Sequence, residues 1–347
     1  MPSPRQPARP VARDAGPAGN PAALADKVRA GDRRALAKAI TLVESTRADH
    51  QEGAQKLLEL LLPDTGKAAR IGISGVPGVG KSTFIEAFGL HLIGAGKRVA
   101  VLAVDPSSAV SGGSILGDKT RMASLSAAPE AFIRPSPAAG SLGGVSRRTR
   151  EALLVCEAAG YDVVLVETVG VGQSEYAVAS MVDFFLVLML AGAGDELQGI
   201  KKGILELADA LAINKADGDN VDRAKRAAAE YRSALRLFRH TAEWEPLVVT
   251  VSALEGRGMD EVWRIVEEHR ARLGASGLLA RKRQEQQRTW LWSMIEDGLR
   301  GQFLARDDVK RLLPEMQEAV ASGKLTPTQA ARRLLDAGTR SRPVRRA

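Results

Sequence analysis

The chain contains few of the residues that build metal clusters or disulfide frameworks. Its 347 residues include one cysteine, Cys156, and four histidines. A single cysteine excludes a disulfide framework and any multi-cysteine metal or iron–sulfur cluster. It also favours a reducing, cytoplasmic location. The longest apolar run, residues 184–194, is too short to cross a bilayer, so we expect no membrane span and no membrane partner.

The net charge of +8 is concentrated at the two ends of the chain. Residues 1–22 hold three arginines against one aspartate, and residues 332–347 hold six arginines against one aspartate. The body between them is nearly neutral, so we expect solvated basic tails and no nucleic-acid partner. The Pro-, Ala- and Gly-rich residues 1–22 predict a disordered tail, and an arginine-rich transit peptide is the alternative interpretation.

Hydrophobic periodicity divides the rest of the chain into three parts. Residues 23–65 carry apolar residues at three- and four-residue spacing and predict an N-terminal helical segment. Residues 66–275 alternate short apolar runs with amphipathic stretches, which predicts an α/β domain with a mainly parallel sheet covered by helices on both faces. Residues 276–347 lack strand-like runs and predict a helical arm that ends in the basic tail. The predicted strands are Ile71–Ser74, Val99–Val104, Phe132–Arg134, Val163–Glu167, Phe184–Leu190, Ala210–Ile213 and Leu247–Val251.

A phosphate-binding motif lies between the first predicted strand and the helix that follows. Residues 75–82 read GVPGVGKS and match G-x-x-x-x-G-K-[ST], the P-loop. Such a loop turns backbone N–H groups toward phosphate oxygens at a helix N-terminus. We expect Lys81 to reach the β- and γ-phosphates and Ser82 to ligate Mg²⁺. The residues predicted to bind phosphate are Gly75, Val76, Pro77, Gly78, Val79, Gly80, Lys81, Ser82 and Thr83.

Two further segments indicate guanine as the base. Residues 214–217 read NKAD after a predicted strand, which is the N-K-x-D pattern of guanine sites. The Asp217 carboxylate can accept from the two N–H groups on the guanine edge, and Lys215 can pack over the base. Residues 252–254 read SAL after another strand and resemble a loop that contacts the guanine carbonyl. The sequence therefore predicts GTP and GDP as ligands, with Asn214, Lys215, Asp217, Ser252, Ala253 and Leu254 at the base.

Acidic residues at strand ends are candidates for Mg²⁺ and for positioning water. Glu167 ends a predicted strand and is followed three residues later by Gly170, where related GTPases have D-x-x-G. Asp105 follows the strand 99–104 and would face the same site, because ligands gather at the carboxyl ends of parallel strands; a helix cap or a turn is the alternative role for this residue. Thus Lys81, Glu167 and Asp105 are the candidate catalytic residues of the core motifs.

The position that carries a water-orienting glutamine in Ras-type GTPases is Val171 here. An apolar side chain cannot orient water, so we expect slow intrinsic hydrolysis and help from elsewhere. Gln173 and Gln198 are nearby candidates for that help.

Taken together, these motifs resemble the MeaB/ArgK G-protein chaperones of adenosylcobalamin-dependent mutases, which belong to the SIMIBI branch of P-loop proteins. The matching stretches are GVPGVGKST (75–83), VDPSS (104–108), LGDKTRM (116–122), ETVGVGQSE (167–175), QGIKK (198–202) and NKAD (214–217).

The resemblance implies a fold, a site and partners. It implies that Asp105, Asp118 and Glu167, with Ser82, surround Mg²⁺ and the attacking water. It further implies that a segment ending in Lys201 is pushed into the nucleotide site by the partner mutase. Members are homodimers joined through C-terminal helices, and they gate adenosylcobalamin loading and protect the mutase, typically methylmalonyl-CoA mutase.

Two other interpretations remain open at this point. One is a metal-insertion GTPase of the same branch that serves a nickel enzyme, although such proteins usually carry Cys or His clusters and Cys156 reads as a buried thiol in a helix. The other is a scaffold that binds GTP but barely hydrolyses it.

Overall fold

The computed structural model describes residues 20–104, 121–136, 142–168, 174–192, 202–236 and 243–339. The chain divides into two compact units, with the boundary after Gln284. No helix in these described ranges is long and apolar enough to span a membrane.

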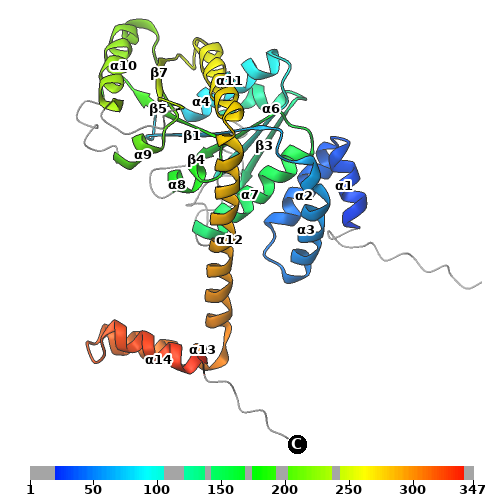
Figure 1. The fold of residues 1–347 in the computed structure, drawn as a ribbon, viewed down its shortest axis with the longest axis vertical. Helices are drawn as coiled ribbons and strands as arrows, with labels where there is room; N and C mark the ends of the chain where they lie inside the picture. The colour runs from blue at the N-terminus through cyan, green and yellow to red at the C-terminus, as the bar shows by residue number, and fades with distance from the viewer. Residues whose placement is uncertain are drawn as a thin grey trace, which may run out of the picture. The chain divides into compact units, whose positions relative to one another are not determined.

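Unit 1 is built on a seven-stranded sheet in which every neighbouring pair is parallel, with the order β3-β2-β4-β1-β5-β6-β7 (Figure 1). The α/β P-loop fold with a mainly parallel sheet, predicted from the sequence, is confirmed, and in the structure all the paired strands are parallel. Every predicted strand is present, with ends within two residues of the expected ones. The strands are β1 (Ala69–Gly75), β2 (Val99–Val104), β3 (Ala131–Ser136), β4 (Val163–Thr168), β5 (Phe184–Leu190), β6 (Ala210–Asn214) and β7 (Leu247–Thr250).

Helices cover both faces of the sheet because alternate strand residues are apolar on both sides. One face packs on α4 (Lys81–Gly94), α6 (Ala123–Ala127) and α11 (Met259–Ala275) and buries Phe84 and Phe88. The other face packs on α7 (Leu142–Ala158), α8 (Ser174–Ala179) and α10 (Val221–Leu235) and buries Cys156. The shorter helices α9 (Lys202–Leu207) and η3 (Gly218–Asn220) complete the connections.

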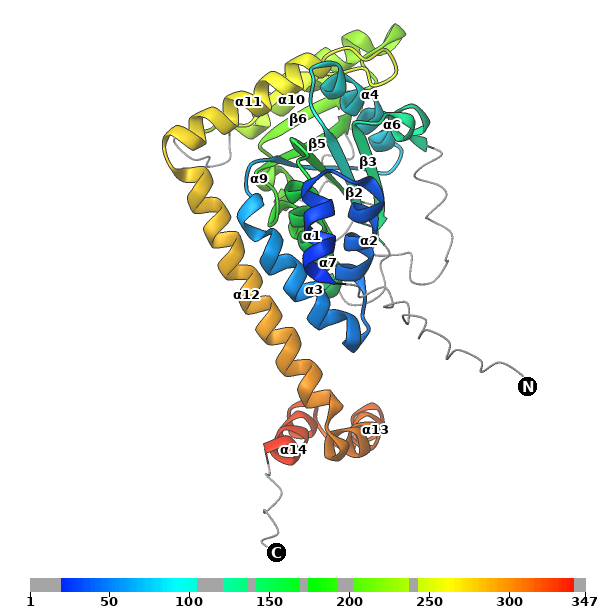
Figure 2. The same cartoon turned by 90° about the vertical axis from the view of Figure 1, so that its right-hand side faces the viewer.

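The N-terminal helices extend this second layer. They are α1 (Pro21–Arg29), α2 (Arg33–Glu44), α3 (Ala48–Leu61) and the short η1 (Leu62–Asp64), and they lie against α7 in Figure 2. Asp32 caps α2 by accepting from the N–H groups of Arg34 and Ala35 at 2.8 and 3.0 Å, which satisfies two of the helix's free donors. The predicted N-terminal helical segment therefore packs its buried apolar residues against those of α7.

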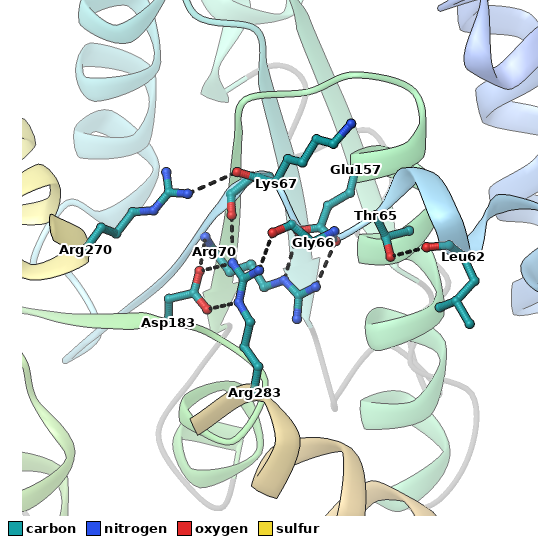
Figure 3. Close-up of polar contacts among 10 residues, drawn as sticks. Leu62, Thr65, Gly66, Lys67, Arg70, Glu157, Asp183, Arg270 and Arg283 are labelled. Atoms are coloured by element: carbon teal, nitrogen blue, oxygen red, sulfur yellow. Dashed lines mark hydrogen bonds and ion pairs between the residues drawn. The ribbon is translucent and has the colours of Figure 1, made fainter. Parts of the chain in front are cut away.

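Buried charged side chains hold the sheet at the amino ends of its strands (Figure 3). Arg70 of β1 donates from Nε and Nη2 to the Glu157 carboxylate of α7 at 3.0 and 2.8 Å. Asp183, which precedes β5, accepts from the Arg70 backbone N–H at 3.0 Å. It also accepts from Nε and Nη2 of Arg283 at 2.8 and 2.7 Å, a bidentate pair.

The first two turns of α12 (Leu278–Ala305) belong to unit 1 through this network. Arg283 donates to the Ala68 carbonyl at 2.9 Å, and Lys282 Nζ donates to the Asp183 carbonyl at 2.6 Å. Lys282 Nζ also lies 3.6 Å from the Asp209 carboxylate. We expected the helical arm from residue 276, and the ion pairs explain why the compact unit extends to Gln284.

Unit 2 contains the remainder of α12 together with α13 (Asp307–Ala321) and α14 (Pro327–Thr339). α13 and α14 pack against each other. A capping box starts α14: the Gln329 N–H donates to Thr326 Oγ1 and the Thr326 N–H donates to Gln329 Oε1, each at 3.2 Å. Pro327 occupies the first helical position, where its missing N–H would have no intrahelical partner.

Candidate nucleotide-binding site

The P-loop connects the carboxyl end of β1 to the amino end of α4, as its motif predicts. The backbone of the loop requires glycine at Gly78, where φ is +79°, and at two further positions. Gly80 has φ +92°, and a Cβ on Gly75 would lie 2.5 Å from the Leu188 carbonyl oxygen. The Gly80 carbonyl accepts the first helical bond from the Phe84 N–H at 2.9 Å. The loop therefore ends where the unpaired N–H groups of the helix N-terminus begin.

Lys81 lies over this loop and is held by backbone carbonyls. Its Nζ donates to the Gly75 oxygen at 2.8 Å and contacts the Val76 oxygen at 3.4 Å. Burial lowers the pKa of the ammonium, while the charges of Glu167 and Glu175 act to raise it. Within the described ranges Lys81 forms no ion pair, so its charge is free to act on an anionic ligand at the loop.

Glu167 is buried near the end of β4, in register with Ile73 of β1. Its neighbour Leu165 packs on the face covered by α4, and side-chain alternation directs Glu167 to the same face. Glu175, at the start of α8, is also buried, and the sequence analysis gave it no role. Its place in the ETVGVGQSE stretch was the signal that could have drawn attention to it.

Of the four residues that we expect around Mg²⁺, the structure describes Ser82 and Glu167. The Ser82 hydroxyl opens α4 and the Glu167 carboxylate closes β4, and hydroxyl and carboxylate oxygens are the donors that Mg²⁺ takes. This donor set fits the ion. Asp105, Asp118, Gly170 and Lys201 lie outside the described residues. Asp105 directly follows β2, whose last residue pairs with Thr168 beside Glu167.

Two of the residues predicted to bind the base, Asn214 and Lys215, contact the P-loop from the end of β6. Asn214 Nδ2 donates to the Val79 carbonyl at 2.8 Å, and Asn214 Oδ1 accepts from the Ala253 N–H at 3.2 Å. Asn214 was expected to read guanine; its side chain ties the P-loop to the 252–254 loop. Lys215 Nζ donates to the Gly78 carbonyl at 2.9 Å, and its φ of +59° is stabilised by Asn220, which donates to the Lys215 carbonyl at 2.6 Å.

Asp217 is fixed by the second base-site loop. Ser252 is fully buried, and its hydroxyl donates to Asp217 Oδ2 at 2.6 Å. The same hydroxyl accepts from the Glu255 N–H at 3.1 Å. Leu254 is 79% exposed. An oriented carboxylate suits a guanine edge, because the two N–H donors of that edge need acceptor oxygens.

One supporting residue has no signal in the sequence. Glu86 of α4 accepts from the Ser124 N–H at 2.7 Å and thereby joins the P-loop helix to the start of α6. Close packing reinforces this contact, because a Cβ on Gly89 would meet the Leu125 side chain at 2.7 Å. A glutamate in a helix reads as a solvated side chain, so only the fold reveals the contact.

Comparison with known proteins extends the match beyond the motifs. Residues 36–308 match the family model described as methylmalonyl-CoA mutase-associated GTPase MeaB. The chain is 57% identical over 314 residues to a probable GTPase of Mycobacterium tuberculosis, covering 90% of this chain and 94% of that protein. It is 51% identical over 319 residues to GTPase ArgK of Escherichia coli, covering 91% and 96%.

A mouse protein and a solved structure are also similar. The chain is 51% identical over 318 residues to the mouse methylmalonic aciduria type A homolog, mitochondrial, covering 88% of this chain and 77% of that protein. It matches the crystal structure of a LAO/AO transport system kinase with a TM-score of 0.73 and 44% identity, covering 91% of this chain and 96% of that one.

Proposed function

Because the chain belongs to the family of methylmalonyl-CoA mutase-associated GTPases and is itself a GTPase, we propose that it is the G-protein chaperone of an adenosylcobalamin-dependent mutase. In this role GTP hydrolysis gates the loading of adenosylcobalamin and protects the mutase. The partner that we propose is methylmalonyl-CoA mutase. The observation that carries this proposal is the family match over residues 36–308, whose description names that mutase.

The geometry supports guanine nucleotides as the ligands, with the residues in the roles that the sequence predicted. Residues 75–83 and Lys81 hold the phosphates, and Asp217 reads the guanine edge. Asn214 joins the two loops through its bonds to Val79 and Ala253, which couples base binding to phosphate binding. Ser82 and Glu167, with Asp105 and Asp118, hold Mg²⁺, which supplies charge neutralisation on the phosphate oxygens when bound.

Hydrolysis by this site alone is slow in our proposal, because Val171 offers no polar group to orient water. We propose that the mutase brings Lys201 to the γ-phosphate, where a cation stabilises the charge that develops as water attacks phosphorus and GDP leaves. The arginine finger of other GTPases is the analogous device, and it increases the rate of hydrolysis by about 10³–10⁵. Lys201→Ala is expected to leave basal turnover nearly intact and to abolish turnover stimulated by the mutase.

The test is phosphate release measured with and without saturating methylmalonyl-CoA mutase. Lys202→Ala is the matched control, because it removes the same charge from the adjacent position at the start of α9. Full stimulation of the Lys201→Ala protein would contradict the role of Lys201. Absence of any stimulation of the unmodified protein, together with no complex in a pull-down with GMP-PNP, would contradict the mutase as partner.

We further propose that unit 2 joins two copies of the chain into a homodimer. Leu291, Trp292 and Leu299 of α12 are 58%, 63% and 62% exposed, an apolar stripe that is costly to leave in water. Removal of residues 285–347 is expected to yield a monomer in analytical ultracentrifugation. This truncation keeps Lys282 and Arg283, so their contacts within unit 1 are preserved. A truncated protein that remains dimeric would place the interface elsewhere.

The two alternatives have less support. Within the described ranges no group of three or more His, Cys, Asp or Glu side chains is arranged to hold a metal ion, as an insertion protein for nickel would need. Cys156 is buried, and burial raises the pKa of its thiol well above the ordinary value, so it is an inert core residue. The same phosphate-release assay distinguishes the proposed GTPase from a scaffold that binds GTP without hydrolysing it. The single cysteine is consistent with the cytoplasmic site of action that we propose.

A further inference from the structure

Two buried hydroxyl groups meet where the sheet opens toward the P-loop. Ser74 is next to last in β1 and Thr168 is last in β4, and they are 1% and 0% exposed. Thr168 Oγ1 donates to Ser74 Oγ at 3.0 Å and lies 3.5 Å from the Ile73 carbonyl oxygen. Burial of a hydroxyl costs free energy unless it is hydrogen-bonded, so packing alone would favour apolar side chains here.

The pair lies where the backbone pairing of β1 with β4 stops before the ends of the two strands. β1 stays paired with β5 as far as Gly75, and β4 stays paired with β2 as far as Thr168. Between β1 and β4, pairing ends sooner, at Ile73 and Glu167, which is two residues before the end of β1 and one residue before the end of β4. The hydroxyl bond therefore continues the contact between β1 and β4 beyond the end of their backbone ladder.

On the two sides of this bond lie the groups that must act on the same phosphate. Ser74 precedes Gly75, whose carbonyl oxygen holds Lys81 at 2.8 Å. Thr168 follows Glu167, whose charge acts on Lys81. Side chains alternate along a strand, so Glu167 faces α4 while Thr168 makes its bond on the opposite face of the sheet. A change at Thr168 thus reaches Glu167 through the backbone without touching the ligand.

We propose that Thr168 and Ser74 are a positioning pair for GTP hydrolysis, which sets the end of β4 relative to the P-loop. The proposal rests on the nucleotide site described above. GDP is held by the P-loop and the base loops, whereas the γ-phosphate of GTP must meet both the P-loop and the end of β4. Loss of the pair is therefore selective: it slows hydrolysis and weakens binding of a GTP analogue, and it spares GDP.

The experiment compares Thr168→Val, Thr168→Ser, Ser74→Ala and the double variant Thr168→Val/Ser74→Ala. Thr168→Val keeps the shape and removes the donor, and one hydrogen bond of this kind corresponds to about a 3- to 10-fold loss of kcat. We expect GDP affinity to change less than about twofold on the same scale. Thr168→Ser is expected to restore kcat, and the double variant to be no slower than either single one, because both remove the same bond.

Ser45→Ala is the control, because it removes a hydroxyl that bonds to His50 at 2.9 Å in the N-terminal helices, far along the chain from the nucleotide loops. It should leave all nucleotide parameters unchanged. If Thr168→Val fails to fold, Ser74→Ala removes the acceptor without adding volume and makes the same comparison.

Two results would overturn the proposal: an unchanged kcat in the folded variants, or an equal loss of affinity for GDP and GMP-PNP, which marks a purely structural bond. A different result would contradict the proposed nucleotide site itself. If that site were wrong, Lys81→Ala would bind guanine nucleotides as well as the unmodified protein does.

Discussion

The two ends of the sheet hold their charged side chains in opposite ways. At the amino ends of the strands, Arg70 pairs with Glu157 and Arg283 pairs with Asp183, and all four are largely buried (Figure 3). At the carboxyl ends, Lys81 is held by backbone carbonyls, and the Asp217 carboxylate is held by a serine hydroxyl.

The two kinds of partner correspond to two roles that we assign to the charged side chains of the sheet, namely stabilising the fold and binding a ligand. Charges that satisfy each other stabilise the fold and have nothing left to offer a ligand, whereas charges held by neutral partners keep their field for an incoming ion. Ligands generally bind at the carboxyl ends of parallel strands, and the candidate site that we propose lies at that end.

The largest effect that we expect comes from breaking a pair at the amino end. Asp183→Ala leaves Arg283 without its bidentate partner and removes the acceptor of the Arg70 N–H. Removal of one member of a buried pair costs about 3–5 kcal/mol, and denaturant unfolding should show this loss. Asp222→Ala is the control, because Asp222 makes only an exposed contact of 4.0 Å with Lys225. Similar stability of the two variants would contradict the structural role of the amino end.

The same pair makes a pH prediction. Burial alone would raise the pKa of Asp183, but the hydrogen bond and charge of Arg283, with Arg70, lower it. Its contribution to the free energy of unfolding is therefore complete above the ordinary aspartate pKa of about 3.9 and is lost as pH falls through the lower folded value. The stability advantage of the unmodified protein over Asp183→Asn should shrink below about pH 3.9 and stay constant above about pH 5.

At the carboxyl end, Lys81→Ala is expected to reduce GTP turnover by about 10²–10³, the cost of removing a preorganised charge from a reaction centre. Because Lys81 bonds only to the carbonyls of its own loop, the melting temperature should change little. Lys97→Ala removes a lysine that precedes β2 at the other end of the sheet and should keep full activity. Phosphate release and thermal melting of the two variants give a direct contrast.

Base selection is expected to depend on Asp217. Asp217→Asn exchanges one acceptor oxygen for a donor, which should cost about 1–3 kcal/mol of GTP affinity and should allow xanthosine nucleotides, with a carbonyl in place of the amino group, to compete. Competition titrations with XTP measure both effects. Unchanged GTP affinity without a gain for XTP would show that this loop does not read the base.

The smallest effect that we expect is that of Ser252→Ala, which leaves Asp217 in place and removes the hydroxyl that orients it. One such hydrogen bond contributes about 0.5–1.5 kcal/mol, so GTP affinity should fall modestly while GDP and GTP remain in the same ratio. An effect on GTP alone would mean that Ser252 senses the γ-phosphate, and the comparison of roles would need revision.

Local patterns were sufficient to predict most of the fold and to nominate the residues of the candidate nucleotide site. Apolar runs of four residues (163–166) and seven residues (184–190) predicted β4 and β5, because strands buried on both faces have few polar positions to obscure them. The P-loop and the NKAD segment were found because their geometry requires particular residues at fixed spacing, such as Gly80 with its positive φ.

The contacts that the sequence could not predict join residues far apart in the chain. Arg283 lies 100 residues from Asp183, and within the sequence it reads as one more cation on a basic helix. Asn214 was assigned to the base, and its bonds to Val79 and Ala253 follow only from the packing of β6 beside the P-loop. Pairing of polar groups depends on which strands become neighbours, and that information is not local.

One measurement tests the contrast between the two ends most directly. A fluorescent guanine nucleotide is titrated into the unmodified protein, Lys81→Ala and Arg283→Ala, and the melting temperature of each is recorded in the same buffer. Our account predicts that Lys81→Ala loses nucleotide affinity at an unchanged melting temperature, and that Arg283→Ala melts lower with its affinity retained. Retained affinity in Lys81→Ala, or lost affinity in folded Arg283→Ala, would contradict it.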